Sequence, residues 1–80
     1  MESTLGLVES LVRPLIDFEE ALEITGSTAE DGTILIELHV HEEDAGKVIG
    51  RQGRVIKSIR TLTRAAASRH NNQVEVELRD

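Results

Sequence analysis

The residues best suited to chemistry lie in one short segment, Val48 to Ile56, which reads VIGRQGRVI. Gly50 and Gly53 are three positions apart in it, and an arginine follows each of them. Because glycine has no Cβ, it adopts positive φ angles and allows another molecule to approach the backbone closely. The residues after Gly53 are predicted to begin a helix, and a helix N-terminus carries a partial positive charge that attracts anions. Bare backbone, a helix start and guanidinium groups together favour binding of a phosphodiester.

On its own, a Gly-x-x-Gly spacing is weak evidence for a phosphate-binding loop, since six glycines in 80 residues can produce it by chance. In the alternative interpretation, Gly50 simply caps a helix and the segment is an ordinary helix–turn–helix. The charge distribution changes the balance. The net charge is −6, and residues 1–44 hold one basic and twelve acidic side chains, but residues 45–73 hold seven basic and no acidic ones. Charges are screened over about 8 Å in physiological salt, so a basic segment can attract phosphate locally, although a solvated helix face would look similar.

Several functional classes find no support in the composition. The chain has no cysteine, hence no disulfide, thiolate nucleophile or thiolate metal site. Phe18 is the only aromatic residue, which argues against proteins that stack bases on aromatic platforms. Neither P-loop spacing nor a Ser-His-Asp constellation is evident. We therefore expect no enzyme activity, no cofactor and no small-molecule substrate.

Metal binding and membrane association are not expected either. The acidic run Glu42 to Asp44 is typical of a helix start, and His39 and His41 lack a third ligand at a recognisable spacing. The first residues carry no basic signal-like region, and no apolar run approaches the length needed to span a bilayer. These features lead us to expect a cytoplasmic protein without metal.

Apolar periodicity predicts the element order α-β-β-α-α-β in a single α+β domain over residues 1–80. The predicted elements are an amphipathic helix ended near residue 16 by Pro14, strands over 20–26 and 33–40 joined by an Asp31-Gly32 turn, helices over 43–49 and 54–70, and a strand over 74–78. The two-helix connection allows the last strand to pair in parallel with the second. The result is a three-stranded mixed sheet with three helices packed on one face.

The last helix is expected to separate its apolar and basic residues. On a count of 100° per residue, the predicted core arc holds Val55, Ile56, Ile59, Leu62, Thr63 and Ala66. The basic residues predicted on the opposite side are Arg54, Lys57, Arg60 and Arg64.

With these elements in place, the chain resembles a KH domain of type II. The loop Gly50-Arg51-Gln52-Gly53, preceded by Val48-Ile49, matches the KH signature Val/Ile-Ile-Gly-x-x-Gly. The run from Ala45 to Leu62 resembles the small stand-alone KH proteins of bacteria, the KhpA family. The resemblance covers essentially the whole chain, although the N-terminal third matches loosely and Arg51 stands where lysine is common.

The resemblance implies binding of single-stranded RNA, with the loop clamping the backbone of about four nucleotides. Gly50 and Gly53 would permit backbone approach, while Arg51 and Gln52 would face the phosphates. Ala45, Val48 and Ile49 would wall an apolar groove for bases, although the sequence does not show which of these side chains face the core. Arg54 and Lys57 would reach adjacent phosphates. The implied RNA-binding residues are Lys47, Val48, Ile49, Gly50, Arg51, Gln52, Gly53, Arg54 and Lys57.

The family also implies a homodimer, or a heterodimer with a larger KH-containing protein of the Jag/KhpB type. Two functional hypotheses follow. In the first, the chain binds single-stranded RNA as a post-transcriptional regulator or RNA chaperone. In the second, it is a KH-fold dimerisation module in a complex that controls cell elongation and division, and RNA contact is secondary. The small residues Ala65 to Ala67 support the second hypothesis.

Overall fold

The elements follow one another in the predicted order, α-β-β-α-α-β, and the prediction of the fold class is confirmed. The computed structural model describes residues 2–79. Its main elements are α1 (Glu2–Val12), β1 (Glu23–Thr28), β2 (Ile34–His39), α2 (Glu42–Ile49), α3 (Arg54–Ser68) and β3 (Val74–Arg79). Three short 3-10 turns join them: η1 (Arg13–Leu15), η2 (Glu19–Ala21) and η3 (Arg51–Gly53).

The sheet has the predicted mixed topology, with strand order β1-β2-β3. β1 and β2 form an antiparallel hairpin in which Glu23 lies opposite His39. β3 runs parallel to β2, with Ile34 opposite Val74 and His39 opposite Arg79. Both parallel strands therefore end at the same edge of the molecule, beside the start of α2.

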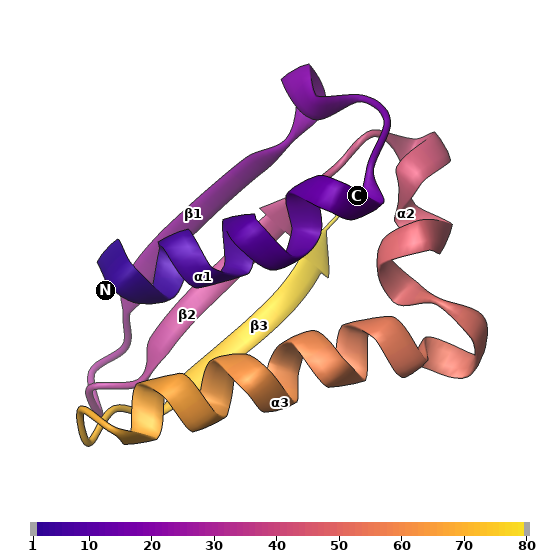
Figure 1. The fold of residues 1–80 in the computed structure, drawn as a ribbon. Helices are drawn as coiled ribbons and strands as arrows, with labels where there is room; N and C mark the ends of the chain where they lie inside the picture. Colours follow the sequence, from indigo (N-terminus) through magenta and orange to yellow (C-terminus); the bar gives the residue numbers. More distant parts are fainter. Residues whose placement is uncertain (1, 80) are drawn as a thin grey trace.

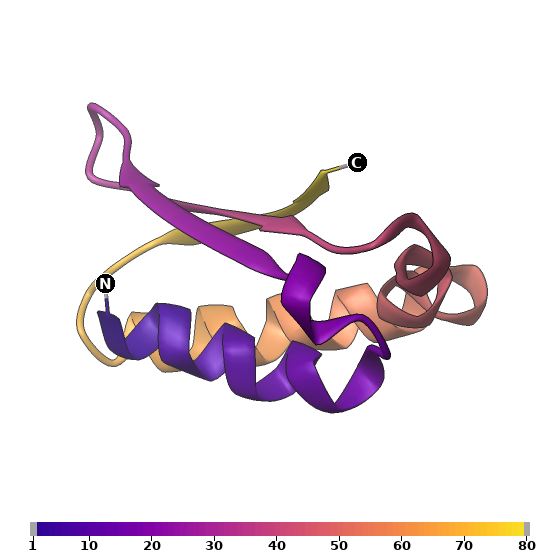
Figure 2. The same cartoon turned by 90° about the horizontal axis from the view of Figure 1, so that it is seen from above.

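The helices form one layer and the sheet another, as the view from above shows (Figure 2). α1 and α3 lie across the same face of the sheet, and α2 stands at one end (Figure 1). The core between the layers is built from alternate residues of β2 and β3 and from one stripe of each helix. Its buried members include Val8, Val12, Ile34, Ile36, Leu38, Val48, Ile56, Ile59, Val74 and Val76. None of the helices within residues 2–79 combines the length and apolar character needed to cross a membrane.

The boundaries differ from the predicted ones where backbone chemistry intervenes. α1 ends at Val12 rather than near residue 16, because the ring of Pro14 fits a 3-10 turn but not a helix interior. β1 starts at Glu23 rather than at residue 20, since the residues before it form the turn η2. The predicted turn at Asp31-Gly32 is present: Gly32 has φ 91°, and Thr33 N donates to Asp31 Oδ1 at 2.9 Å.

Two residues of α3 lie elsewhere than predicted. Leu62 is 52% exposed rather than part of the core, because the buried stripe of α3 is narrow and consists of Ile56, Ile59, Thr63 and Ala67. Arg60 is half-buried rather than opposite the core, and its Nε donates to the carbonyl oxygen of Val76 at 2.9 Å. It follows Ile56 by one helical turn, so it lies near the core side and reaches over the edge of the sheet.

The buried carboxylate of Asp44 fixes α2 to the segment that follows α1. Asp44 has no exposed surface, and its two oxygens accept hydrogen bonds from the amides of Asp17 (3.0 Å) and Phe18 (2.9 Å). Lys47 Nζ lies 3.3 Å from Asp44 Oδ1 and also contacts Asp17. Burial alone would raise the pKa of Asp44, but the two amides and Lys47 outweigh it, and the pKa lies below its ordinary value. The orientation of α2 therefore depends on a charged group.

The start of α2 is secured by a second contact with the same segment. His41 is the N-cap, and its Nδ1 accepts a hydrogen bond from Glu43 N at 3.1 Å. Its ring stacks on Phe18 with a centroid separation of 4.0 Å. The single aromatic residue of the chain thus serves to hold α2 in place.

We predict that Asp44 makes stability depend on acid pH. Because folding lowers its pKa, the folded state binds the proton less tightly than the unfolded state, so the free energy of unfolding falls as pH drops from about 4 through the folded-state pKa. Asp44→Asn leaves a backbone amide without an acceptor and should lower the Tm at neutral pH by roughly 5–15 °C. The substitution should also reduce the dependence of the free energy of unfolding on pH in the acid range.

Thermal unfolding followed by circular dichroism between acid and neutral pH measures both effects. Glu43→Gln is the matched control, since Glu43 lies on the same helical turn with an exposed side chain. Equal Tm values for the two variants at neutral pH would contradict the role of Asp44.

Candidate nucleic-acid interface

The loop between α2 and α3 is a single tight turn formed by left-handed backbone conformations. Gly50 has φ 78° and ends α2, donating its amide to the carbonyl oxygen of Gly46 at 2.8 Å. Gln52 (φ 57°) and Gly53 (φ 73°) also have positive φ. Gly53 N donates to Gly50 O at 3.1 Å, which closes the turn immediately before α3 begins.

Gly50 tolerates no side chain, because α3 folds back against it. A Cβ at this position would lie 2.3 Å from Cγ2 of Val55 and 2.9 Å from its backbone nitrogen. At Gly53 a Cβ would meet no atom within 4 Å, so only its φ favours glycine there. The two glycines thus have different roles: Gly50 permits close packing of the two helices, and Gly53 permits the turn.

The tip of the loop offers free donors to solvent. Arg51, Gln52 and Arg54 are exposed, and Arg54 Nη2 donates to Gln52 Oε1 at 3.2 Å. In the described part of the chain, the amides of Gly50, Gly53 and Arg54 donate backbone hydrogen bonds within or next to the loop. The amides of Arg51 and Gln52 donate none to the described residues. The ion pairs among residues 2–79 do not involve Arg51, Arg54 or Lys57. Cationic groups and amides without a competing partner are suited to an anion.

Two of the predicted site residues are placed differently from the rest. Val48 has no exposed surface and packs in the core, so the prediction that its side chain walls a groove is wrong. Lys47 bridges Asp17 and Asp44, and these carboxylates, the hydrogen bond to Asp17 foremost, raise its pKa above the ordinary value. Its charge therefore neutralises a buried acid and is not free like that of Arg51.

A depression that the sequence did not reveal in full lies at the first turns of α2. It is lined by Val40, Glu42, Ala45 and Arg79. Ile49, at the end of α2, is 41% exposed. Ala45 was predicted to wall such a groove and does so, whereas Ile49, predicted beside it, is not part of this lining. The other three lining residues were missed. Arg79 lies there because β3 runs parallel to β2 and ends beside α2. The register of these two strands depends on pairing between distant parts of the chain.

The charges of the folded molecule are separated in space. The outer face of the sheet, away from the helices, carries Glu23, Glu37, Glu75 and Glu77. Arg79 partly neutralises it, with Nε 2.9 Å from Glu37 and Nη2 2.6 Å from Glu77. The loop and α3 carry five of the seven basic residues of the acid-free segment; the other two are Lys47 on α2 and Arg69 directly after α3. With a radius of gyration of 12.1 Å, the molecule is large enough for these surfaces to act separately, since screening is effective over about 8 Å.

Comparison with known protein families agrees with this geometry. Residues 6–78 match the family model described as "KhpA/KhpB, KH domain". The chain belongs to the KhpA/KhpB KH-domain family. The family predicted from the residues around Gly50 is confirmed. The turn Gly50–Gly53 between α2 and α3 is called the KH loop below.

Curated relatives of similar length carry the same family name. The chain is 43% identical to RNA-binding protein KhpA of Clostridium acetobutylicum over 72 residues, which cover 90% of this chain and 95% of the relative. It is 42% identical to RNA-binding protein KhpA of Borreliella burgdorferi over 74 residues, 92% of this chain and 89% of the relative. It is 40% identical to RNA-binding protein KhpA of Listeria monocytogenes, covering 90% and 93%. These are names of binding proteins rather than of enzymes, as expected for this chain.

Solved structures show the same fold within a larger protein. Aquifex aeolicus Era bound to GDP and AlF4⁻ matches with a TM-score of 0.64 and 19% identity, over 94% of this chain and 29% of Era. Era in complex with MgGDPNP and a segment of 16S ribosomal RNA matches with a TM-score of 0.67, also at 19% identity. The chain spans less than a third of Era, and at this identity the likeness concerns the fold alone.

The two glycines of the KH loop should respond differently to substitution. Gly53→Ala incurs only the cost of a left-handed alanine, about 1–2 kcal/mol. Gly50→Ala incurs a larger backbone cost, because φ 78° and ψ 173° lie in a region that is essentially restricted to glycine. The collision with Val55 adds to it, and overpacking typically costs about 1–3 kcal/mol. Urea unfolding of both variants measures the difference in free energy of unfolding. Equal losses would contradict the close contact between Gly50 and Val55.

Proposed function

We propose that this chain binds single-stranded RNA and that the KH loop holds the sugar–phosphate backbone. The observation that carries the proposal is the exposed Gly50–Gly53 turn, in which the guanidinium of Arg51 and the amides of Arg51 and Gln52 have no competing partner among the described residues. The names of the curated relatives, RNA-binding protein KhpA, support the same ligand. Arg51 and the adjacent amides would contact phosphates, with Gln52 held by Arg54.

The bases of the bound strand would lie in the depression beside α2. Val40 and Ala45 offer apolar surface there, and Glu42 and Arg79 offer an acceptor and donors for base edges. The exposed side chain of Ile49 lies nearer the loop, at the end of α2. Lys57 is exposed one turn after Arg54 and would contact a neighbouring phosphate. Few phosphates are contacted, so the affinity of this lone domain should be modest and should fall as salt rises. Such binding suits a cytoplasmic post-transcriptional regulator or RNA chaperone.

Replacing the loop tip with acids tests the proposal. In Arg51→Asp/Gln52→Asp both glycines remain, and aspartate tolerates the left-handed conformation at position 52, so the fold should persist. Repulsion of phosphate should weaken binding of a uridine tetranucleotide at low salt by about tenfold or more. NMR titration measures the affinity, and circular dichroism checks the fold.

A double variant at the far end of α3 provides the matched control. Arg69→Asp/Asn71→Asp makes the same change in net charge, and Asn71 also has a positive φ of 60°. It should bind the tetranucleotide nearly as well as the unmodified protein. If both double variants lose affinity equally, or neither does, the loop is not the RNA contact.

A second candidate function is self-association, or pairing with a larger Jag/KhpB-type KH protein in a complex that controls cell elongation and division. One observation favours it. Leu62 is a large apolar side chain, 52% exposed, on the helical layer. One turn later, Ala66 lines a shallow pocket between α1 and α3 together with Leu7. A second KH domain seated there would cover apolar surface that solvent now contacts.

Sedimentation velocity over a range of concentrations tests this surface. The unmodified protein should gain mass with concentration, and Leu62→Gln should remain a monomer. Leu35→Gln is the control, because Leu35 is also exposed (37%) but lies on the outer face of the sheet. An unmodified protein that stays monomeric at every concentration would contradict self-association.

A further inference from the structure

A cavity with several polar residues in its wall lies at the end of α3 that is remote from the KH loop. It has a volume of about 310 Å³ and is lined by Arg64, Ser68, Asn72, Gln73, Val74 and Glu75. The guanidinium and the two side-chain amides donate hydrogen bonds, and the amide oxygens accept them. The hydroxyl of Ser68 already donates to Ala65 O at 3.0 Å and offers only an acceptor. This combination suits a phosphate together with a base or ribose, and the KH loop does not use it.

One flank of α3 joins this cavity to the KH loop. Arg60 bonds Val76 O, and Arg64 Nη2 lies 3.8 Å from Glu75 Oε2, so this flank faces β3. Lys57 precedes Arg64 by two helical turns and lies on the same side. α3 runs from the loop to the turn that leads into β3; β3 begins beside the C-terminal end of α3 and diverges from it toward the loop (Figure 1). The axial distance from Arg54 to Arg64 is about 15 Å at 1.5 Å per residue.

We infer that an RNA strand longer than the segment at the loop continues along this flank and places a phosphate at Arg64. The inference rests on the proposed function and extends its footprint beyond the roughly four nucleotides that a KH loop clamps. Residues 45–73 contain no acid, so the strand meets only basic and neutral side chains of α3 on the way.

Arg64 is available for this contact, and Glu75 is its competitor. Their side chains are 55% and 57% exposed, and exposed ion pairs of this length contribute little. A phosphate can instead accept two parallel hydrogen bonds from the guanidinium. Among the described residues that line the cavity, Glu75 is the only acid, so it opposes the phosphate and limits the affinity of the site.

Comparison of a short and a long oligonucleotide tests the inference. Arg64→Gln should leave the affinity for a uridine tetranucleotide unchanged and should weaken binding of a uridine dodecanucleotide about three- to tenfold at low salt. It should also reduce the slope of log K against log salt by about 0.7, the value of one phosphate contact on a single strand. Glu75→Gln should strengthen binding of the dodecanucleotide only.

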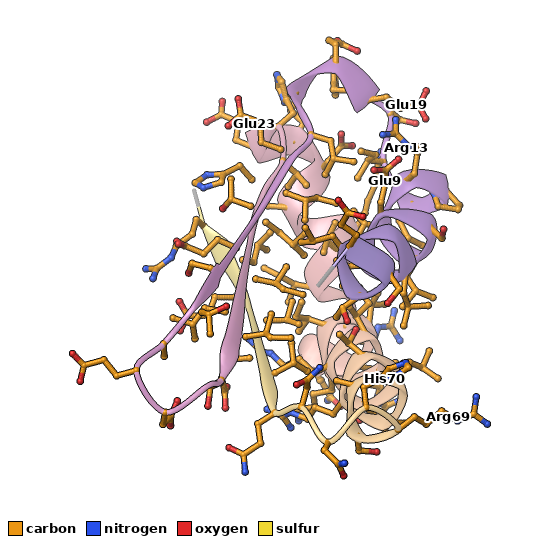
Figure 3. The ribbon with its side chains drawn as sticks, turned by 90° about the vertical axis from the view of Figure 1, so that its left-hand side faces the viewer. Glu9, Arg13, Glu19, Glu23, Arg69 and His70 are labelled. Atoms are coloured by element: carbon orange, nitrogen blue, oxygen red, sulfur yellow. The ribbon has the colours of Figure 1, made fainter. Side chains whose placement is uncertain are left out.

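Arg69→Gln is the matched control, since Arg69 directly follows α3 as its C-cap and points away from the sheet (Figure 3). Equal losses in the Arg64 and Arg69 variants, or equal losses for both oligonucleotides, would overturn the inference and leave the loop proposal intact. If neither oligonucleotide binds the unmodified protein, both proposals fail.

Discussion

The close approach of α3 to the backbone of Gly50 is the constraint on which the remaining structure depends. No side chain fits between Gly50 and Val55, so α2 can end and α3 can begin within three residues. That tight turn directs α3 back across the sheet, where Ile56 and Ile59 complete the core. It also leaves the two residues between the glycines exposed at the end of the molecule. The same contact therefore serves packing on one side and presents donors to solvent on the other.

Local patterns in the sequence predicted most of the fold. The alternation of Ile34, Ile36 and Leu38 predicted β2, and the separation of the last two strands by two helices predicted their parallel pairing. The errors concern side chains whose exposure and contacts depend on residues distant in the chain. A helical count gives the direction of Leu62 or Arg60 but not which element covers it. In the fold, Arg60 donates a hydrogen bond to Val76 O at the edge of the sheet, and no element of residues 2–79 covers Leu62, which stays exposed. The amides bound by Asp44 lie 27 and 26 residues away, so the acidic run indicated only a helix start.

The candidate site was predicted less completely than the fold. The loop residues Gly50 to Arg54 lie together as expected, because their spacing alone defines the turn. Lys47 looked equivalent to Arg51 in the sequence, yet only the fold brings Asp17 beside it. The depression beside α2 depends on the arrival of Arg79 from the last strand. Charge separation explains how an acidic chain can serve a polyanion: acids cover the outer sheet face, and the basic segment lies on the loop and α3. This polarity should orient the molecule toward RNA as well as attract it.

Mapping of amide chemical shifts during titration with a single-stranded uridine dodecanucleotide tests the central claim most directly. The account predicts that the largest changes fall on the amides of Gly50 to Arg54, with further changes along the flank of α3 that faces β3. The outer sheet face around Glu37 should remain unaffected. Changes concentrated on that acidic face, with the loop amides unmoved, would contradict the account.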